Sequence, residues 1–585
     1  MRWAAAVVGG LVALGAPASA ADDAGFVQLE VRGQTSSDWH PNPRYSHDGR
    51  YAGVVQRRAD DTLEVKVENV YTYYSIDVEI GTPKQKQTLL IDTGSSDIWV
   101  IGSENPYCAS TPKEKAQAAM GVNYIDCGGS GTFNLSDSSS FRKNDTDFFI
   151  QYGDYSFAKG GWGTDVLAFA GTRVPAVSFA VGEETNSSQG VFGIGLQGLE
   201  STVSNNDGAY DNLPLQLRNE GKIARVAYSL WLNDIQSRAG SLLFGGVDHA
   251  KYSGDLQKVP IVSNVDKKGD DPVEMTVVLS GLGIKKNTAS KRDHDGAAES
   301  IMSSNVPVLL DSGTSLVLLP DAVLRAVGRA TGAEYSRELG YYVQECGAGD
   351  GGAALEFDFS GLKIDVALAD LLLPLSDGAG NPSQFANGKA ACALGMSEAT
   401  DTIILGDTFL RSAYVVYDLE NHEIAMAPVK YNQTKSDIET IKSDIPKAKK
   451  APRYSSTKLA QTVSLNSVDQ ALSEVKSQTL TAANNVGFAG AQSTQQTVES
   501  SLVTGSISSI SRDTRSNIWS TVSAKPTSSN LPTSSESVSS SSSSSSASAS
   551  SATSASSSSS NGAQQQLPCL LAAALCILLS ACITC

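Results

Sequence analysis

Histidine is scarce in this chain, which has five copies in 585 residues. No His-Glu-x-x-His segment occurs, so the usual motif of zinc proteases is missing. No Gly-x-Ser-x-Gly segment occurs either, which argues against a serine hydrolase with a nucleophile elbow. The histidines are scattered, and the four cysteines before residue 500 contain no Cys-x-x-Cys pair, which argues against a zinc site. We therefore expect no metal ion and no other cofactor.

Basic residues are also fewer than acidic residues. The chain has 45 Lys and Arg against 62 Asp and Glu, which gives a net charge of −17. This balance argues against a nucleic-acid partner, because phosphate binding needs basic surfaces. Hydrophobic residues make up 41% of the chain, so a folded core is feasible, but 585 residues are too many for a single core. We expect several structural units.

The beginning of the chain carries an apolar segment. Arg2 precedes an apolar run over residues 4–16, and small residues follow at Ala18 and Ala20. A basic start, a short apolar run and a small-residue cleavage site are typical of a signal peptide, here over residues 1–20. An N-terminal membrane anchor is the alternative, although the run is short for a membrane span.

The end of the chain carries a second apolar segment. Residues 567–585 are apolar throughout, and small residues at 561–563 and a polar spacer precede them. This pattern predicts a glycosylphosphatidylinositol (GPI) attachment signal over residues 561–585, with Asn561 as the expected attachment residue. A serine within residues 556–560 is the alternative attachment site, and a transmembrane helix is the alternative to the anchor. The two ends predict an extracellular protein that travels through the secretory pathway to the cell membrane or the cell wall.

Composition divides the rest of the chain into three regions. Residues 21–58 are polar and end in the dibasic pair Arg57-Arg58, which predicts a pro-segment removed by processing proteases. Residues 59–431 alternate β-branched and aromatic runs with glycine-rich turns, as in β-strands. Residues 432–560 are polar, with lysines first and long serine runs later. Such a tract buries too little apolar surface to order its backbone, so we expect an unstructured, O-glycosylated stalk.

Local signals mark individual elements within the β-rich region. Residues 71–80 are dense in aromatic and β-branched residues, and residues 88–91 are mostly apolar, so both stretches predict strands. Pro320 opens the clearest helical stretch, residues 321–331. Because short strands outnumber helices, we expect a mostly β fold.

Cysteines and glycosylation sequons both fit a secreted protein. The four cysteines outside the tail favour two disulfides. Neighbours along the chain favour Cys108–Cys127 and Cys346–Cys392, although spacing alone allows three pairings. The four Asn-x-Ser/Thr sequons, where we expect glycans, are Asn134, Asn144, Asn186 and Asn432.

Two segments of the β-rich region resemble each other. Residues 89–96 read Leu-Leu-Ile-Asp-Thr-Gly-Ser-Ser, and residues 308–315 read Val-Leu-Leu-Asp-Ser-Gly-Thr-Ser. Each is an apolar strand that ends in an aspartate followed by a hydroxyl residue and glycine. Two apolar residues and a glycine follow each segment at a similar distance, at residues 191–193 and 404–406. This internal duplication implies two related lobes that face each other across a cleft.

The two repeated aspartates, Asp92 and Asp311, are the expected catalytic residues. Peptide hydrolysis by water needs a base that takes a proton and an acid that donates one. Two carboxyls held about 3 Å apart do not both ionise, so they share one proton and supply both roles.

Six neighbouring residues are expected to support this pair. Gly94 and Gly313 let the backbone turn sharply and approach the carboxyls. Two hydroxyl side chains can brace the loops, and two can donate hydrogen bonds to the outer carboxyl oxygens. These are Thr93 and Ser312 for the braces, and Ser95 and Thr314 for the donors.

The chain resembles the pepsin-like aspartic proteases over residues 65–430, and within them the fungal GPI-anchored yapsins. The resemblance rests on the two aspartate segments, with Trp99 shortly after the first, and on residues 404–411, Ile-Leu-Gly-Asp-Thr-Phe-Leu-Arg. It implies a mostly β, bilobal fold, with lobes at residues 59–228 and 229–431 and the active-site cleft between them. It also implies an endopeptidase that acts on proteins and peptides, and we expect a monomer.

The family has a hairpin flap over the cleft, with a tyrosine that hydrogen-bonds the tryptophan after the first aspartate motif. The matching segment here is Tyr152-Gly153-Asp154, so Tyr152 is the expected flap tyrosine and Trp99 its partner. Many relatives have a small residue where this chain has Tyr155. A bulky residue there is expected to alter flap mobility or to narrow the site.

Yapsins favour cuts beside basic residues, which implies acidic side chains in the substrate pocket. Asp154 is the best placed candidate, and a solvated turn aspartate is the alternative. Two insertions, residues 109–126 and 285–304, predict surface loops, and the second contains Lys291-Arg292. The strongest rival to an enzyme is an inactive cell-wall adhesin or pseudo-protease. Such a protein is free to lose the aspartates, glycines and flap tyrosine that this chain retains.

Overall fold

The computed structural model describes residues 26–34, 73–119, 124–236, 239–263, 272–286, 297–337, 339–375, 382–400 and 402–459. Several sequence predictions lie outside these ranges: the signal peptide, the dibasic pair Arg57-Arg58, Lys291-Arg292, the serine-rich tract and the tail with Asn561. Within the described ranges, no helix is both long and apolar enough to cross a membrane.

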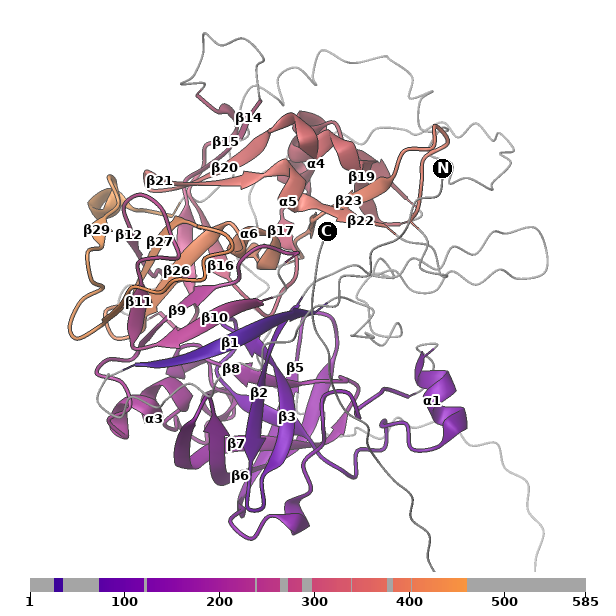
Figure 1. Ribbon diagram of the computed structural model, residues 1–585, viewed down its shortest axis with the longest axis vertical. Coiled ribbons are helices and arrows are strands. Elements are labelled where there is room, and N and C mark those ends of the chain that lie inside the picture. Colours follow the sequence, from indigo (N-terminus) through magenta and orange to yellow (C-terminus); the bar gives the residue numbers. More distant parts are fainter. Residues whose placement is uncertain are drawn as a thin grey trace, which may run out of the picture. The chain divides into compact units, whose positions relative to one another are not determined.

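Strands dominate the structure, as the many β-branched runs predict. The largest sheet has 14 strands and draws them from both halves of the sequence (Figure 1). In spatial order they are β29 (Lys449–Lys450), β12 (Gln257–Pro260), β27 (Glu423–Pro428), β26 (Ala413–Asp418), β9 (Ala227–Trp231), β10 (Ala239–Phe244), β1 (Val27–Gln34), β2 (Tyr73–Ile80), β3 (Gln85–Asp92), β8 (Gly190–Gly193), β4 (Ile98–Ile101), β7 (Thr172–Thr185), β6 (Phe157–Phe169) and β5 (Arg142–Gln151).

Four smaller sheets contain only strands that follow residue 245. One sheet pairs β11 (Gly246–Asp248) with β28 (Ile438–Thr440), and another has the order β13 (Thr276–Leu279), β16 (Val306–Leu310), β25 (Ile404–Leu405), β17 (Val317–Leu319) and β24 (Met396–Glu398). A third sheet has the order β15 (Glu299–Met302), β14 (Gly281–Lys285), β20 (Ala354–Phe359) and β21 (Leu362–Ala367). The fourth has the order β18 (Glu334–Ser336), β19 (Tyr341–Glu345), β23 (Ala391–Leu394) and β22 (Leu372–Pro374).

Helices are few and short in the part of the chain that the structure describes. The longest, α4 (Asp321–Thr331), starts directly after Pro320, as the sequence predicts. It ends at Gly332, whose φ of +80° is a left-handed conformation that glycine adopts readily. The others are α1 (Pro112–Ala119), α2 (Ser201–Ser204), α3 (Leu213–Asn219), α5 (Leu368–Leu371) and α6 (Asp407–Leu410), with 3-10 turns η2 (Leu135–Asp137), η3 (Gln197–Leu199), η4 (Cys346–Gly351) and η5 (Tyr454–Ser456).

The internal duplication of the sequence recurs in the sheets. β3 ends in Asp92 and runs parallel to β8, and β8 pairs antiparallel with β4. In the second half, β16 ends just before Asp311 and runs parallel to β25, and β25 pairs antiparallel with β17. The apolar-apolar-glycine segments therefore lie beside the aspartate strands in both halves. Each aspartate occupies an equivalent three-strand setting.

The strands that carry the aspartates belong to one continuous hydrophobic core. Ile91 and Phe192 from the first half, and Leu310 and Leu405 from the second, have no exposed surface. All four belong to the same cluster of buried side chains. Because a protein interior is close-packed, neither strand can shift without disturbing its neighbours, and this fixes the position of each aspartate.

One strand of the large sheet comes from the region where the sequence predicts a pro-segment. β1 lies between β10 and β2 and pairs antiparallel with both (Figure 1). Its alternate residues Val27, Leu29 and Val31 are buried, and Arg32 forms an ion pair with Asp77. This segment thus contributes both backbone hydrogen bonds and apolar side chains to the folded protein.

The structure differs from the sequence prediction after residue 431. The sequence predicts an unstructured stalk from residue 432, but residues 432–459 are folded, with β28 paired to β11 and β29 paired to β12. Ile441, Ile445 and Ala451 are at most 3% exposed. The prediction is wrong for this stretch because a few well-placed apolar residues dock a segment whose average composition is polar.

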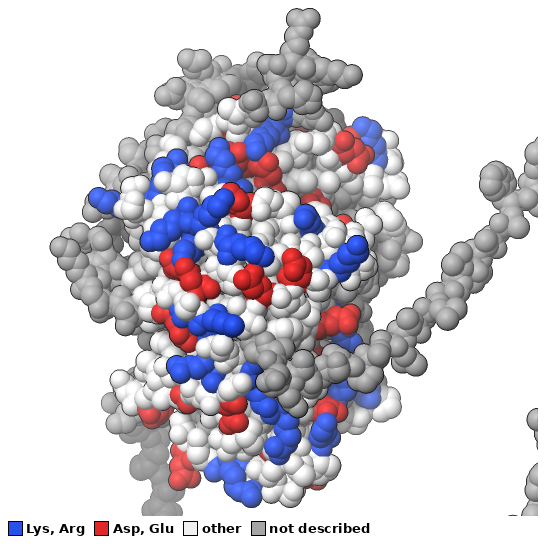
Figure 2. All heavy atoms as spheres, turned by 60° about the vertical axis from the view of Figure 1, so that its left-hand side comes forward, with Lys and Arg blue, Asp and Glu red and all other residues white. Residues whose placement is uncertain are grey.

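Ion pairs accompany this docking. Lys258 Nζ lies 2.7 Å from Asp444 Oδ1, and Lys449 Nζ lies 2.9 Å from Asp255 Oδ2. Figure 2 turns this side of the protein forward and shows basic and acidic side chains interleaved. Lys258 is buried, whereas both members of the Lys449–Asp255 pair are exposed, and an exposed pair contributes at most about 1 kcal/mol.

Both disulfides favoured by the sequence are present. Cys108 is bonded to Cys127, and Cys346 is bonded to Cys392. The first closes the loop that carries α1, and this loop was one of the two predicted surface insertions. Lys113 and Lys115 of α1 are exposed, in agreement with a surface position.

One of the four sequons is buried. Asn186 is 3% exposed, and its Oδ1 accepts a hydrogen bond from Phe157 N at 2.8 Å. Its Nδ2, the atom to which a glycan attaches, is also buried. A glycan there is incompatible with this packing, so the expectation for Asn186 is wrong for the folded protein. Asn144 and Asn432 are exposed and Asn134 is half-buried.

The docked C-terminal segment yields a stability prediction. Ile441 has no exposed surface and packs in a cluster with Val247, Tyr252 and Tyr414. We expect Ile441→Ala to lower the free energy of unfolding by about 2–5 kcal/mol, because it leaves a cavity in this cluster. Urea denaturation of the full-length protein measures the change. The exposed neighbour is the control: Lys442→Ala should change the free energy by less than about 0.5 kcal/mol. Equal stability of the two variants would contradict the packing described.

Candidate active site

The two repeated aspartates sit in equivalent turns and are held in the same way. Asp92 is 5% exposed and Asp311 is 7% exposed. The N–H of Gly94 donates to Asp92 Oδ1 at 2.8 Å, and Ser95 Oγ donates to Asp92 Oδ2. The second turn repeats the pattern: Gly313 N donates to Asp311 Oδ1 at 2.7 Å, and Thr314 Oγ1 donates to Asp311 Oδ2 at 2.6 Å. The hydrogen bonds therefore match the supporting roles that the sequence predicts.

Each carboxyl group lies against the glycine of the opposite turn. A Cβ atom on Gly94 would lie 2.6 Å from Asp311 Oδ1, and a Cβ atom on Gly313 would lie 2.5 Å from Asp92 Oδ1. Any side chain at these positions would collide with a carboxyl group. The two glycines thus allow the aspartates of the two halves to approach each other, which the sequence predicts from the duplicated motif.

Thr93 and Ser312 brace the two turns reciprocally. Thr93 Oγ1 donates to Leu310 O at 2.9 Å and accepts from Ser312 N at 3.0 Å. Ser312 Oγ donates to Ile91 O at 2.9 Å and accepts from Thr93 N at 3.3 Å. These bonds cross from one half of the chain to the other, and both hydroxyl groups are buried. They fix the distance between the two turns.

Electrostatics favour a shared proton at this site. Burial, followed by the negative charge of Asp311, raises the pKa of Asp92 well above its usual range. The hydrogen bonds from Ser95 and Gly94 oppose the shift but do not cancel it. Two neighbouring carboxyls in a buried site hold one proton between them, because two adjacent negative charges repel. Such a pair can accept a proton with one member and donate one with the other.

A hairpin carries the expected flap tyrosine beside the first turn. β5 and β6 form this hairpin, and Tyr152 lies in the turn between them. Trp99 Nε1 donates a hydrogen bond to the Tyr152 hydroxyl at 2.7 Å, so the structure brings together the two residues that the resemblance pairs. Burial, with the charge of Asp92 acting in the same direction, raises the pKa of Tyr152, so its hydroxyl stays protonated.

The turn of the hairpin holds two further residues that the sequence singles out. Asp154 Oδ1 accepts hydrogen bonds from Ser156 N at 2.9 Å and from Ser156 Oγ at 2.6 Å. Tyr155 has a φ of +63°, a left-handed conformation that is strained for any residue with a Cβ. The chain therefore carries a bulky side chain in a backbone conformation that disfavours one.

One buried aspartate beside the second turn received no role from the sequence. Asp407 is fully buried, and its N–H donates to Thr314 O at 2.8 Å. Burial raises the pKa of Asp407 well above its usual range, the charge of Asp311 acts in the same direction, and the guanidinium of Arg411 opposes both. The sequence feature that points to Asp407 is its position directly after the Ile-Leu-Gly segment of the duplication.

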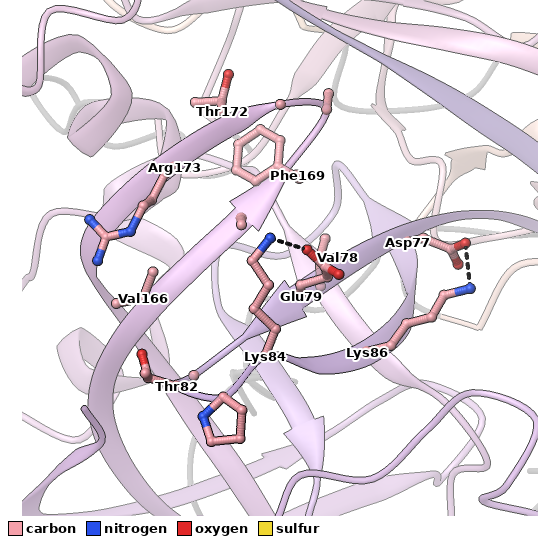
Figure 3. Close-up of a pocket in the computed structure, with 15 residues that line it drawn as sticks. Asp77, Val78, Glu79, Thr82, Lys84, Lys86, Val166, Phe169, Thr172 and Arg173 are labelled. Carbon is pink, nitrogen blue, oxygen red and sulfur yellow. Dashed lines mark hydrogen bonds and ion pairs between the residues drawn. The ribbon is translucent and has the colours of Figure 1, made fainter. Parts of the chain in front are cut away.

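A surface groove of about 640 Å³ lies elsewhere in the first half of the chain (Figure 3). It is formed by the turn between β2 and β3 and by the hairpin of β6 and β7. Lys84 pairs with Glu79 at 2.6 Å and Lys86 with Asp77 at 3.1 Å, so these lining charges compensate one another. It contains neither aspartate of the duplicated motif. Among the described residues, no group of His, Cys, Asp and Glu side chains is arranged to hold a metal ion.

Known proteases are similar to this chain in sequence. A family model described as eukaryotic aspartyl protease matches residues 73–429. The aspartic proteinase MKC7 of Saccharomyces cerevisiae is 39% identical over 452 residues, which cover 69% of this chain and 73% of that protein. Aspartic proteinase 3 of the same yeast is 38% identical, with 68% of this chain and 77% of that protein covered. Aspartic proteinase yapsin-3, also from this yeast, is 38% identical, with 69% and 75% covered.

The reciprocal brace yields a prediction for Thr93. In Thr93→Val a methyl group replaces the hydroxyl, which leaves Leu310 O and Ser312 N buried without this partner. We expect the free energy of unfolding to fall by about 1–3 kcal/mol, measured by urea denaturation. Thr172→Val, at a half-buried threonine at the start of β7, is the control and should change it by less than about 0.5 kcal/mol. A Thr93→Val protein as stable as the parent would show that the brace contributes nothing.

Proposed function

The chain belongs to the eukaryotic aspartyl protease family, and on that premise we propose that Asp92 and Asp311 are the catalytic carboxyls of this aspartic endopeptidase. The observation that carries the proposal is the mirrored geometry of the two turns. Each carboxyl accepts the same pair of hydrogen bonds, and each lies against the glycine of the other turn. No other two carboxyls of the described residues share this duplicated setting.

The mechanism follows from the shared proton. The ionised carboxyl takes a proton from a water molecule, whose oxygen attacks the carbon of the scissile carbonyl group. The protonated carboxyl donates its proton to the carbonyl oxygen, which gives a neutral tetrahedral intermediate. When the C–N bond breaks, the carboxyl protonated by water gives its proton to the leaving nitrogen, and the other carboxyl recovers its proton from the intermediate hydroxyl. One proton is again shared by the pair.

The hairpin that carries Tyr152 is proposed as the flap over the substrate. The hydrogen bond from Trp99 orients the tyrosine hydroxyl and ties the hairpin to the strand after the Asp92 turn. A substrate bound beneath the flap is shielded from water, which strengthens the electrostatic interactions at the catalytic pair. Tyr155 is proposed to narrow the entrance, because it places a bulky side chain in the turn of this hairpin.

Cleavage beside basic residues is proposed as the substrate preference. It is supported by the similarity to a protein named yapsin-3 and by the carboxyl group of Asp154 in the flap turn. Two hydrogen bonds from Ser156 hold this carboxyl in place, so it can present a negative charge to a lysine or arginine of the substrate. The inactive alternative lacks support, because both aspartates, both glycines and the flap tyrosine are retained.

Residues 21–58 are proposed as a pro-segment removed after Arg58. β1 of this segment reads Leu-Glu-Val-Arg at residues 29–32, and residues 63–66 read Leu-Glu-Val-Lys. The second copy lies after the dibasic pair, so it stays with the processed chain. Removal of the pro-segment takes β1 away from β10 and β2 and leaves the edges that paired with it open.

Residence outside the cell is proposed from the two ends of the chain. A signal peptide over residues 1–20 directs the chain into the secretory pathway, and a GPI anchor at Asn561 tethers it. The serine-rich residues 460–560 form the stalk between the folded part and the anchor. The substrates are then cell-surface or secreted proteins and their precursors, which a tethered protease meets without leaving the membrane or wall.

The catalytic pair is tested by substitution. Asp92→Asn and Asp311→Asn should each lower the cleavage rate of a mixed peptide library by about 10²–10⁴-fold or more, because neither amide can exchange the proton. Pepstatin should abolish cleavage by the parent over pH 3 to 7. Asp126→Asn, at an exposed aspartate, is the control and should cut at the parental rate. Cleavage by Asp92→Asn at the parental rate would contradict the proposed mechanism.

The anchor is tested by enzymatic release. A phosphatidylinositol-specific phospholipase should free the protein from membranes into the soluble fraction, because it cuts the lipid from a GPI glycan. Immunoblotting of the two fractions measures the release, and Asn561→Gln is the matched variant that should lose attachment at this residue. Retention of the parent after treatment, with a known GPI protein released in parallel and no covalent link to the wall, would favour a transmembrane helix.

A further inference from the structure

A second pair of buried carboxyl groups lies beside the turn of Asp92. Asp97 follows this motif directly and is 1% exposed, and Glu200, just before α2, is fully buried. Tyr210 connects them: its hydroxyl donates to Asp97 Oδ1 at 2.9 Å, and its N–H donates to Glu200 Oε2 at 2.9 Å. The N–H of Ser201 donates to the second oxygen of Asp97 at 2.9 Å. No sequence motif predicts a role for any of these residues.

One oxygen of this cluster has no partner. Glu200 Oε1 is buried and makes no hydrogen bond with the described residues. An ionised carboxylate in such a place is strongly unfavourable, because its charge leaves water without compensation. The surroundings of Glu200 are therefore those of a neutral, protonated carboxyl group.

The titratable groups around Glu200 are acidic or phenolic. Burial, with the negative charges of Asp97 and Asp211 acting in the same direction, raises the pKa of Glu200 to about 8. Burial also raises the pKa of Asp97 and that of Tyr210. Among the described groups that shift these three pKa values, there is no Lys, Arg or His. No cation there takes the place of the proton.

The sign of the pH effect follows from this shift. Glu200 releases its proton near pH 4.5 in an unfolded chain but near pH 8 in the folded protein. The folded state therefore binds more protons than the unfolded state between these values. The contribution of this proton to stability is fully present below about pH 4.5 and is lost as the pH rises to about 8.

Tyr210 connects the carboxyl pair to the flap. Its ring packs edge-on against Trp162 with centroids 5.0 Å apart, and Trp162 packs edge-on against Phe148 at 5.5 Å. Phe148 lies in β5 and Trp162 in β6, the two strands of the hairpin that carries Tyr152. The negative charge of Asp97 contributes to the raised pKa of Tyr152, so the cluster and the flap tyrosine also interact electrostatically.

We propose that Tyr210 is a positioning residue that holds the base of the flap against the Asp92 turn, and that it does so only while Glu200 keeps its proton. Loss of this proton places an uncompensated charge beside Asp97 in the interior. Glu200 then moves toward water, and the backbone of Tyr210, which is bonded to it, moves too. The inference rests on the proposed function, because a flap matters only where a substrate binds. The second carboxyl pair thus limits the working pH range separately from the catalytic pair.

The positioning role is tested with Tyr210→Phe in the full-length protein. The phenyl ring keeps its place against Trp162, but the hydroxyl bond to Asp97 is lost. We expect the KM for a peptide substrate to rise by about fivefold or more while kcat changes by less than about twofold, because substrate binding needs the flap and chemistry needs the catalytic pair. Tyr335→Phe, at a tyrosine that is 46% exposed, is the control and should change neither constant. An unchanged KM in Tyr210→Phe would overturn the role of this residue.

The proton dependence is tested with Glu200→Gln. Glutamine can accept the hydrogen bond from Tyr210 N but cannot ionise at any pH. Samples are held at pH 6 to 9 and then assayed at the optimum of the parent. We expect the pH of half-inactivation to rise by about one unit in Glu200→Gln. Asp211→Asn removes a charge from an exposed neighbour and should shift the midpoint by less than about 0.3 units.

Thermal unfolding separates the two proposals, because it needs no activity. The melting temperature of Glu200→Gln should exceed that of the parent at pH 8 and equal it at pH 4.5. If the parent cuts peptides, and if Glu200→Gln has the same inactivation and the same melting temperature as the parent at every pH, this inference is wrong. The proposed function would still stand. A parent that cuts no peptide at any pH would remove the proposed function, and with it the positioning role of Tyr210.

Discussion

The reciprocal hydrogen bonds of Thr93 and Ser312 are the constraint on which the site depends. Each hydroxyl group bonds to the backbone of the opposite turn, so the two halves of the chain meet where the two carboxyls must lie. Repulsion between Asp92 and Asp311 opposes this meeting unless they share a proton. The brace and the surrounding core therefore maintain an arrangement that the carboxyl groups by themselves disfavour when both are ionised. Catalysis in this family depends on the same close approach of the two carboxyls, because the shared proton lets one act as an acid and the other as a base.

Burial of acidic groups extends well beyond the catalytic pair. Asp97, Glu200, Asp407 and Asp418 are all buried, and burial is the largest cause of the raised pKa of each. Arg411 and Arg225 offset the effect for the last two only in part. A protein with this interior binds protons on folding, so acidic conditions favour the folded state. Its acidic surface and its acidic interior act differently: the surface charges remain hydrated, whereas the interior carboxyls require protons or cations.

Much of the fold and most of the candidate site could be predicted from the sequence. The duplicated aspartate segments, α4 after Pro320, and the contact of Tyr152 with Trp99 all appear where the patterns predict them. The first two succeed because each depends on a short segment with a strong local signal, whereas the third is implied by the family resemblance. Two predictions fail for the same physical reason. Residues 432–459 and Asn186 both look polar in sequence, yet packing against distant strands buries parts of them. The average composition of a stretch of sequence does not show which of its side chains pack against the hydrophobic core.

The sequence by itself determined the family, the mostly β fold and the identity of the two central aspartates. It did so because the chemistry of peptide hydrolysis requires particular residues in a particular order, and the chain carries that order twice. Only the tertiary structure decided how these groups are charged and held. The raised pKa of Asp92, the brace through Thr93, and the contact of Tyr210 with Asp97 and Trp162 all join residues from different segments. Burial and charge are properties of the folded surroundings, so they arise only when distant parts of the chain come together.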